Sequence, residues 1–286
     1  MIDYHAPAFP GDVLRFAQAL THHGRTSFTM RQTARRTTDD RLIATAEFVF
    51  VSIDRNGRPT PVPRDLAEFL SARPAEPPGV SRMTVNGVSL AVERRGEGPA
   101  VLFVHGYPLD RTLWAHQVAH LEGFQRIAPD LRGFGLSDAP DLGYSLPTYA
   151  DDLAALLDAL QVDEVVLCGL SMGGYVAFEF LRRFRERVRG LVLMDTRADA
   201  DAPEVRRMRD QQIALARDQG AAAIAETMVT RLLAPDTVRH NPTLAEQVRA
   251  MMVAAPVPGI AGALAAMRDR PDSTPLLGTL EGLPTL

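Results

Sequence analysis

The fold is decided by residues 165–174, which read VVLCGLSMGG. The β-branched and apolar run at the start is typical of a buried strand. Residues 169–173 match the pattern G-x-S-x-G, and apolar residues at helical spacing follow from 176 to 184. Strand, tight turn and helix in this order form a nucleophile elbow, with Ser171 at the turn. Side chains at Gly169 and Gly173 would collide in such a turn, and we expect a strained backbone at Ser171.

On both sides of this motif, apolar runs alternate with helical segments; the runs lie at 100–104, 126–130, 164–168 and 191–194. This alternation predicts a parallel sheet with crossover helices. A helix is expected around Leu153–Leu160, with Thr148 and Asp151 as its capping pair. Residues 203–270 are all helical in pattern, which favours a lid over the site. Five methionines in this segment are expected mainly in the core of the lid, or otherwise in a pocket wall: Met208, Met228, Met251, Met252 and Met267.

A second motif, FVHGYP at residues 103–108, follows the first buried strand. An oxyanion hole needs two preorganised N–H donors, which we assign to the backbone of Met172 and, with Gly106 permitting close approach, of Tyr107. His105 precedes the nucleophile in the chain, opposite to the order Ser, acid, His of this architecture. It is therefore expected to hold the loop by hydrogen bonds rather than to act as the base.

The sequence allows two roles for each of two acidic residues, Asp130 and Asp195. In the glycine-punctuated loop at 128–138, Asp130 and Arg132 are interpreted as a structural ion pair, with a role in holding the loops around the site as the alternative. Asp195 ends the fourth strand and is expected to cap the next segment, with a role as catalytic acid as the alternative.

Composition excludes several classes of function. The net charge is −4, and all 31 basic residues are Arg, so a nucleic-acid partner is not expected and no Schiff-base or P-loop lysine exists. The lone Cys168 excludes an intrachain disulfide and is expected to be a packing thiol. No apolar run reaches the roughly 20 residues of a membrane span. We expect a cytoplasmic protein that acts on a small molecule, without a metal or organic cofactor.

The N-terminal segment has a different pattern. Residues 28–35 and 43–53 alternate with period two or are β-branched, which predicts strands; the second ends in a turn at 54–57. Residues 65–70 form a short helix at most. A stretch rich in proline follows, so residues 71–82 are predicted to be a linker between a segment 1–70 and a domain 83–286.

Residues 83–286 resemble the α/β-hydrolase superfamily, in particular the carboxylesterase and enol-lactonase-like branch with a helical cap, here about 197–271. The resemblance implies Ser171 as nucleophile and the N–H groups of Tyr107 and Met172 as oxyanion donors. Serine at the elbow argues against the haloalkane dehalogenase and epoxide hydrolase branches, which use Asp there. The classes that a serine nucleophile still allows are esterases, lactonases, thioesterases and carbon–carbon bond hydrolases.

Residues 1–70 resemble the C-terminal strands of hotdog-fold acyl-CoA thioesterases, through Ile2-Asp3-Tyr4, Pro10-Gly11-Asp12, residues 24–28 and residues 51–63. This partial hotdog segment lacks the family's first strand and central helix, so no catalytic residue is carried over. The resemblance implies a homodimer through this segment and hints at acyl-CoA substrates.

The hydrolase family places an acid and a His after further strands, whereas Leu283–Leu286 looks like the start of the next strand. We expect a fragment of a longer fusion, nearly inactive because His240, the one histidine after Ser171, falls at the start of a lid helix. The alternatives are a non-catalytic ligand-binding or assembly module, and acyl-CoA thioesterase activity in the hotdog portion.

Overall fold

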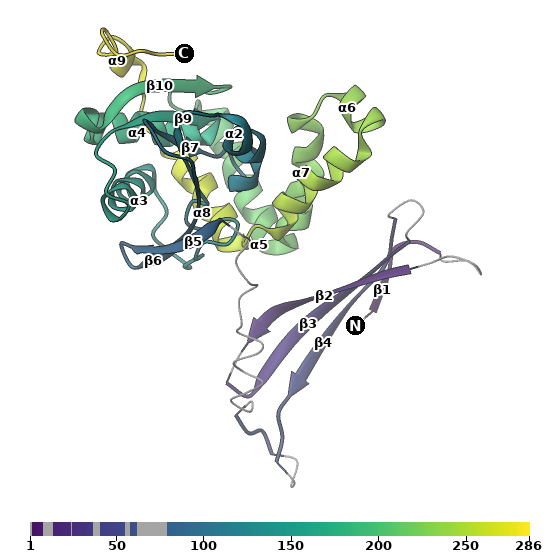
Figure 1. Ribbon diagram of the computed structural model, residues 1–286. Coiled ribbons are helices and arrows are strands. Elements are labelled where there is room, and N and C mark those ends of the chain that lie inside the picture. Colours follow the sequence, from purple (N-terminus) through teal and green to yellow (C-terminus); the bar gives the residue numbers. More distant parts are fainter. Residues whose placement is uncertain (1, 8–13, 24, 37–40, 55–57, 62–78) are drawn as a thin grey trace. The chain divides into compact units, whose positions relative to one another are not determined.

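The computed structural model describes residues 2–7, 14–23, 25–36, 41–54, 58–61 and 79–286, and the chain divides into two units, Met1–Ala75 and Glu76–Leu286 (Figure 1). The helix expected at 65–70 and most of the turn at 54–57 lie outside the described residues. So does most of the expected linker at 71–82. Its last residues are not linker: Val80 already begins a strand, because 80–85 pairs with 88–93.

The first unit contains an antiparallel sheet with strand order β1-β4-β3-β2. The strands are β1 (Ile2–Tyr4), β2 (Leu14–His23), β3 (Ser27–Arg36) and β4 (Leu42–Val51). The strands predicted near 28–35 and 43–53 are confirmed as β3 and β4. Strand β2 is absent from the prediction because its sequence, LRFAQALTHH, has little alternation; it is defined by its pairing with β3. On β4, Phe48 and Phe50 are exposed, with ring centroids 6.4 Å apart.

The second unit is built on a mixed sheet with strand order β10-β9-β7-β8-β6-β5. The strands are β5 (Val80–Val85), β6 (Val88–Arg95), β7 (Ala100–Val104), β8 (Gln125–Pro129), β9 (Val165–Leu170) and β10 (Val188–Met194). The last four strands are parallel, as predicted, and β5 and β6 form an antiparallel hairpin that joins β8.

Strand β7 shows why the strands of this sheet are continuous apolar runs in the sequence. Leu102 and Val104 belong to the core under α3 (Leu146–Ala159) and α4 (Met172–Arg183). Phe103 belongs to a second cluster on the opposite face, with residues of the 3-10 helix η1 (Arg111–Trp114) and of α2 (Ala115–His120). Both faces of the strand are buried, so apolar residues occupy every position.

Helix α3 begins earlier than its predicted cap. Ser145 is the N-cap, and its hydroxyl accepts a hydrogen bond from the N–H of Thr148 at 3.1 Å. The predicted pair of Thr148 and Asp151 is therefore wrong, since both lie inside the helix. Asp151 instead pairs with Arg183 of α4 at 2.7 Å. A proline in the first turn of α3 favours an N-cap at Ser145, three residues before the predicted cap.

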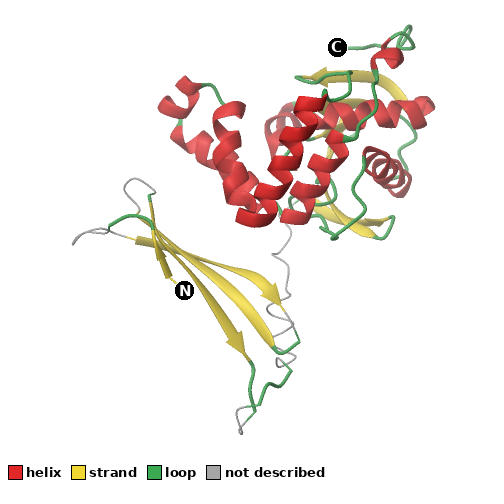
Figure 2. Cartoon of the chain, turned by 180° about the vertical axis from the view of Figure 1, so that it is seen from behind, coloured by secondary structure: helices red, strands yellow, loops and turns green. Residues whose placement is uncertain are grey.

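The segment after β10 is helical, as predicted (Figure 2). It comprises α5 (Pro203–Leu232), interrupted at Gly220 with φ 79°, α6 (Pro235–His240), α7 (Pro242–Ala254) and α8 (Val257–Arg268). We call α5–α8 the cap. Met252 and Met267 are buried in it, as expected, whereas Met208 is exposed. Among the described helices none alone is long and apolar enough to cross a membrane; α7 and α8, bent by 92°, pass that test together by length and composition only.

The cap is seated on the sheet by glycines. A Cβ at Gly259 of α8 would overlap the backbone oxygen of Gly133, which follows β8. Backbone cannot move aside as a side chain can. Gly259→Ala is therefore expected to cost about 2–3 kcal/mol of unfolding free energy. Urea denaturation measures this, with Gly278→Ala as the control, where the nearest atom would lie 3.7 Å away. Equal stability of the two variants would contradict this account of the seating.

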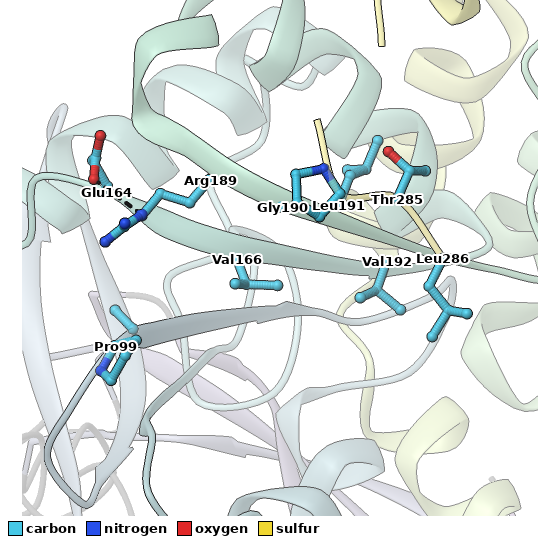
Figure 3. A pocket seen from close by; sticks show the side chains of 11 residues that line it. Pro99, Glu164, Val166, Arg189, Gly190, Leu191, Val192, Thr285 and Leu286 are labelled. Atoms are coloured by element: carbon cyan, nitrogen blue, oxygen red, sulfur yellow. Dashed lines mark ion pairs between the residues drawn. The ribbon is translucent and has the colours of Figure 1, made fainter. Parts of the chain in front are cut away.

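At the β10 edge of the sheet, residues Leu283–Leu286 follow α9 (Thr274–Leu277) and run parallel to β10. Leu286 donates to the carbonyl of Leu191 and accepts from the N–H of Leu193, both at 2.9 Å. A groove of about 510 Å³ lies beside them, with Val166 and Val192 on its apolar wall and the Glu164–Arg189 ion pair (3.3 Å) at its end (Figure 3). None of the predicted site residues lines it.

Candidate active site

Ser171 lies between the end of β9 and the first residue of α4, as predicted. Its backbone has φ 51° and ψ −111°, a region that a residue with a Cβ rarely occupies. Three hydrogen bonds hold this conformation: Ser171 N–H to the Met194 carbonyl (2.9 Å), Gly174 N–H to the Ser171 carbonyl (2.9 Å), and the Thr196 hydroxyl to the same carbonyl (2.8 Å). The surrounding structure imposes the conformation in which a nucleophile elbow presents its side chain.

The glycines around Ser171 are required by close approach. A Cβ at Gly169 would overlap the backbone of Gly173, and a Cβ at Gly173 would overlap the backbone carbonyl of Val104. At Gly174 a Cβ would meet the side chain of Thr196. These contacts confirm the expected crowding at the first two positions and bring α4 against the end of β7.

The loop after β7 lies against the elbow. A Cβ placed on Gly106 would be 3.6 Å from the Ser171 Cβ and 3.3 Å from the Leu170 carbonyl oxygen. Tyr107 is the next residue, and Met172 opens α4, where a first-turn N–H has no acceptor within its helix. The two assigned donors therefore follow segments that touch. That their N–H groups converge on one point stays a prediction.

His105 holds this loop, as expected. The side chain is fully buried; its Nε2 accepts from the N–H of Leu131 at 3.0 Å, so Nδ1 carries the proton and donates to the Gly106 carbonyl at 3.0 Å. Both ring nitrogens are thereby used by backbone groups. Burial lowers the pKa of His105, and the ring stays neutral.

This burial predicts a loss of stability in acid. In the unfolded chain this histidine has a pKa of about 6.5, so below that pH it binds a proton that the buried ring does not bind. The free energy of unfolding therefore falls as the pH falls, by up to about 1.4 kcal/mol per pH unit. Urea denaturation at pH 7.0 and 5.5 measures the slope. His105→Gln should lose this contribution, and His116→Gln, at an exposed position, should keep it. An unchanged slope in His105→Gln would show that another group is responsible.

The predicted ion pair between Asp130 and Arg132 is wrong. Asp130 is buried and accepts from the guanidinium and the backbone N–H of Arg111, at 2.6 and 2.7 Å, and from the N–H of Leu136 at 2.8 Å. Arg132 makes a two-pronged pair with Asp152 of α3, at 2.5 and 2.7 Å. Two separate buried pairs thus tie the loop after β8 to η1 and to α3. The sequence could have indicated that Asp152 is a buried acidic residue, since its spacing places it on the apolar face of its helix with Tyr149 and Leu156. No pattern in the sequence indicates that Arg111 is buried.

Other sequence candidates lie elsewhere. Asp195 is exposed with φ 43°, and Ala202, not Asp195, is the N-cap residue of α5. His240 is the last residue of α6, one element before the helix start expected for it; it is exposed, and its Nδ1 contacts the Asp236 carbonyl at 3.0 Å. Within residues 79–286, no hydrogen bond joins a histidine ring to Ser171. Cys168 packs with Phe103 and Trp114, as expected of a packing thiol, and burial raises its pKa to about 11.

Comparisons with known proteins agree with this geometry. The family described as alpha/beta hydrolase fold matches residues 99–277, and the thioesterase-like superfamily matches residues 1–70. The hotdog character of the first unit rests on the second match.

Several relatives are hydrolases. The chain is 39% identical to the AB hydrolase superfamily protein YisY of Bacillus subtilis over 41% of this chain and 45% of that protein. It is 30% identical to 3-oxoadipate enol-lactonase 2 of Acinetobacter baylyi over 58% of this chain and 62% of that protein. The chain thus spans less than two thirds of the length of these curated relatives.

Solved structures show the same fold. A thermophilic esterase from Thermogutta terrifontis superposes with a TM-score of 0.68 at 44% identity, over 72% of this chain and 76% of that one. The enol-lactonase from Burkholderia xenovorans gives 0.64 at 28% identity, over 68% and 75%. Since the family match spans more than half of the 286 residues and includes the strand, elbow and helix around Ser171, the chain belongs to the alpha/beta hydrolase fold family.

Proposed function

We propose that the second unit is a serine hydrolase that cleaves a carboxylic ester or thioester through an acyl-enzyme. The observation that carries the proposal is Ser171 at the strained turn between β9 and α4. Helix α4 directs its positive end toward this residue, where negative charge develops during acyl transfer. The esterase and enol-lactonase neighbours support hydrolysis in general.

The identity of the nucleophile favours esters over other substrates. Relatives of this chain include epoxide hydrolase 2 of Siraitia grosvenorii and the haloalkane dehalogenase of Mesorhizobium japonicum. Those two branches are expected to carry Asp at the elbow, whereas this chain carries Ser. A serine alkoxide attacks acyl carbon, and the resulting ester is hydrolysed by water.

In the proposed reaction, the Ser171 Oγ forms a bond to the carbonyl carbon, and the carbonyl electron pair moves to oxygen. The N–H groups of Tyr107 and Met172 stabilise that oxyanion. The oxyanion then collapses, and the alkoxide or thiolate that leaves takes a proton from water. A second water adds to the acyl carbon, the bond to Ser171 Oγ breaks, and the acid is released with the serine hydroxyl restored. Because no hydrogen bond joins a histidine ring to Ser171 within residues 79–286, its proton passes to solvent. We therefore expect slow turnover, with a rate acceleration on the order of 10³–10⁴ over the uncatalysed reaction in water.

The test uses a fluorophosphonate reagent and the full chain. Phosphonylation forms a bond from Ser171 Oγ to phosphorus and releases fluoride. Because no base activates Ser171 within residues 79–286, we expect slow labelling that reaches at most one adduct per chain, mapped by peptide mass spectrometry to residues around 171. An adduct elsewhere, or none after prolonged incubation at high reagent concentration, would overturn the assignment.

A second candidate places thioesterase activity in the first unit, favoured by its match to the thioesterase-like superfamily. Acyl-CoA hydrolysis that persists after phosphonylation of Ser171 would support it. Dimer formation through residues 1–70 is part of this candidate and is measured by analytical ultracentrifugation.

A further inference from the structure

Two histidine side chains stack on the surface of helix α2. His116 and His120 are four positions apart, so both rings lie on the same side of the helix. The rings are nearly parallel, with centroids 4.3 Å apart and planes inclined by 29°. Both residues are exposed, whereas Val118 between them is buried. The pair is therefore open to solvent and to anything dissolved in it.

One of the two rings is held in the way that metal-binding histidines are held. The Nδ1 of His120 lies 2.9 Å from the carbonyl oxygen of His116. A carbonyl oxygen can only accept, so Nδ1 carries the proton of the neutral ring and Nε2 keeps its lone pair. Histidines that bind metals commonly donate their other N–H to a carbonyl or carboxylate, which fixes the ring and its tautomer. Within residues 79–286, no other hydrogen bond occupies a nitrogen of either ring.

The spacing of the two rings suits contact of both with one transition-metal ion. Bonds of about 2.0–2.1 Å to each nitrogen, at a tetrahedral angle, need two nitrogens roughly 3.4 Å apart. The inclination of the planes brings one pair of ring edges closer together than the centroids. Rotation of each ring about its Cβ–Cγ bond, which is loosely restrained in histidine, supplies the remaining adjustment. Two histidines at positions i and i+4 of one helix is also the spacing by which metalloprotease helices bind zinc.

We infer that His116 and His120 form a binding site for a divalent late transition-metal ion such as Zn²⁺. Imidazole nitrogen is a ligand for Zn²⁺, Cu²⁺ and Ni²⁺, whereas Ca²⁺ and Mg²⁺ prefer oxygen. In the part of the chain that the structure describes, no third histidine, cysteine or carboxylate joins the pair. Water therefore completes the coordination of the ion.

The ion would act on the structure and not on the proposed acyl transfer. Val118 of the same helix packs in the cluster of Phe103 and Trp114, on the face of the sheet opposite α4. Helix α2 has six residues, which is too short for a helix to be stable alone. A metal bridge from position i to i+4 favours the helical form of this segment. The inference is independent of the function proposed for Ser171.

The first experiment uses the full chain without a histidine tag, stripped of metal by a chelator, with zinc chloride as the probe. Isothermal titration should show one Zn²⁺ bound per chain. In His116→Gln and in His120→Gln the dissociation constant should rise at least 10-fold, because a second imidazole on the same helix no longer captures the ion. Undiminished affinity in either variant would overturn the inference.

The matched control is His240→Gln. His240 is exposed at the end of a helix, and its Nδ1 makes the same contact with the carbonyl four residues earlier, at 3.0 Å. No histidine lies four positions before or after it in the sequence. This variant should keep the parent's affinity for Zn²⁺. A loss equal to that of His120→Gln would overturn the inference.

A double variant separates the spacing of the histidines from their number. Gln117→His combined with His120→Gln keeps two histidines on the helix but puts them at adjacent positions, which do not share a face. It should bind Zn²⁺ as weakly as His120→Gln alone. Affinity equal to that of the parent would show that the i, i+4 geometry is not what binds the ion.

Chemical modification locates the ion in the unaltered chain, so the test does not depend on the folding of a variant. Diethyl pyrocarbonate acylates imidazole nitrogen, and peptide mass spectrometry measures the product at each histidine. Saturating Zn²⁺ should slow the modification of His116 and His120 at least 10-fold and leave that of His240 unchanged, and EDTA should reverse the protection. Equal protection of all three histidines, or protection of none, would overturn the inference.

Discussion

Ser171→Ala is expected to leave no fluorophosphonate adduct on the chain, a complete loss of the labelling that the parent shows. The reason is that phosphorus bonds to the one oxygen that the substitution removes, and no other hydroxyl stands at a strained strand-to-helix turn in residues 79–286. Intact-mass spectrometry measures the adduct after equal exposure of both proteins. Labelling of the alanine variant to the parent's extent would place the reactive group elsewhere.

The same position allows a test of strain. Glycine adopts the φ 51°, ψ −111° conformation with less strain than alanine, and such strain costs about 1–3 kcal/mol. The free energy of unfolding of Ser171→Gly is therefore expected to be about 1 kcal/mol larger than that of Ser171→Ala. This difference already allows for the greater conformational entropy of glycine in the unfolded chain. Urea denaturation compares the two, which equally lack the hydroxyl. A glycine variant less stable than the alanine variant would show that the turn is not strained.

Asp130→Asn is expected to be the most destabilising of the substitutions at ion pairs, with a loss of about 3–5 kcal/mol. Asn cannot neutralise Arg111, whose guanidinium is 5% exposed, and its amide cannot accept all three of the hydrogen bonds that Asp130 receives. The loops after β7 and β8 would lose their shared anchor. Urea denaturation gives the loss, or the soluble yield reports it if the variant fails to fold.

The control is Glu204→Gln, which removes one partner of the exposed pair with Arg207. Its loss should be less than about 1 kcal/mol, because water solvates the partner left behind. Losses of similar size in the two variants would mean that burial does not set the energetics of the Asp130 pair.

Local pattern was sufficient for the central sheet. Residues 100–104 and 165–170 are short apolar runs bounded by turns. The glycines at 169 and 173 specify the elbow that follows the second of these strands. The local sequence pattern did not predict a strand whose formation depends on hydrogen bonding to a neighbouring strand. Strand β2 has a mixed composition and is a strand because it pairs with β3. The start of α3 was misplaced because two hydroxyl residues, Ser145 and Thr148, both suit a cap.

The candidate site was predictable only in its backbone. Ser171, Met172 and Tyr107 follow from short motifs, whereas the charged partners join residues far apart in the chain. Arg270 reaches Asp201 across 69 positions, and no spacing rule relates them. Charge type alone could not assign Asp130 to Arg111, which lies 19 positions away in the chain, rather than to its neighbour Arg132.

The cluster of Phe103, Trp114 and Cys168 provides the chain with two intrinsic reporters of one region. Trp114 is the single tryptophan and Cys168 the single cysteine, and the rings of Phe103 and Trp114 lie 5.2 Å apart. Tryptophan emission therefore follows the solvation of this face of the sheet, without any engineered fluorophore. A thiol reagent reaches Cys168 only when β9 opens, so its rate of modification under native conditions measures the free energy of that opening. Coincident values from the two signals would show that the sheet opens as one cooperative unit.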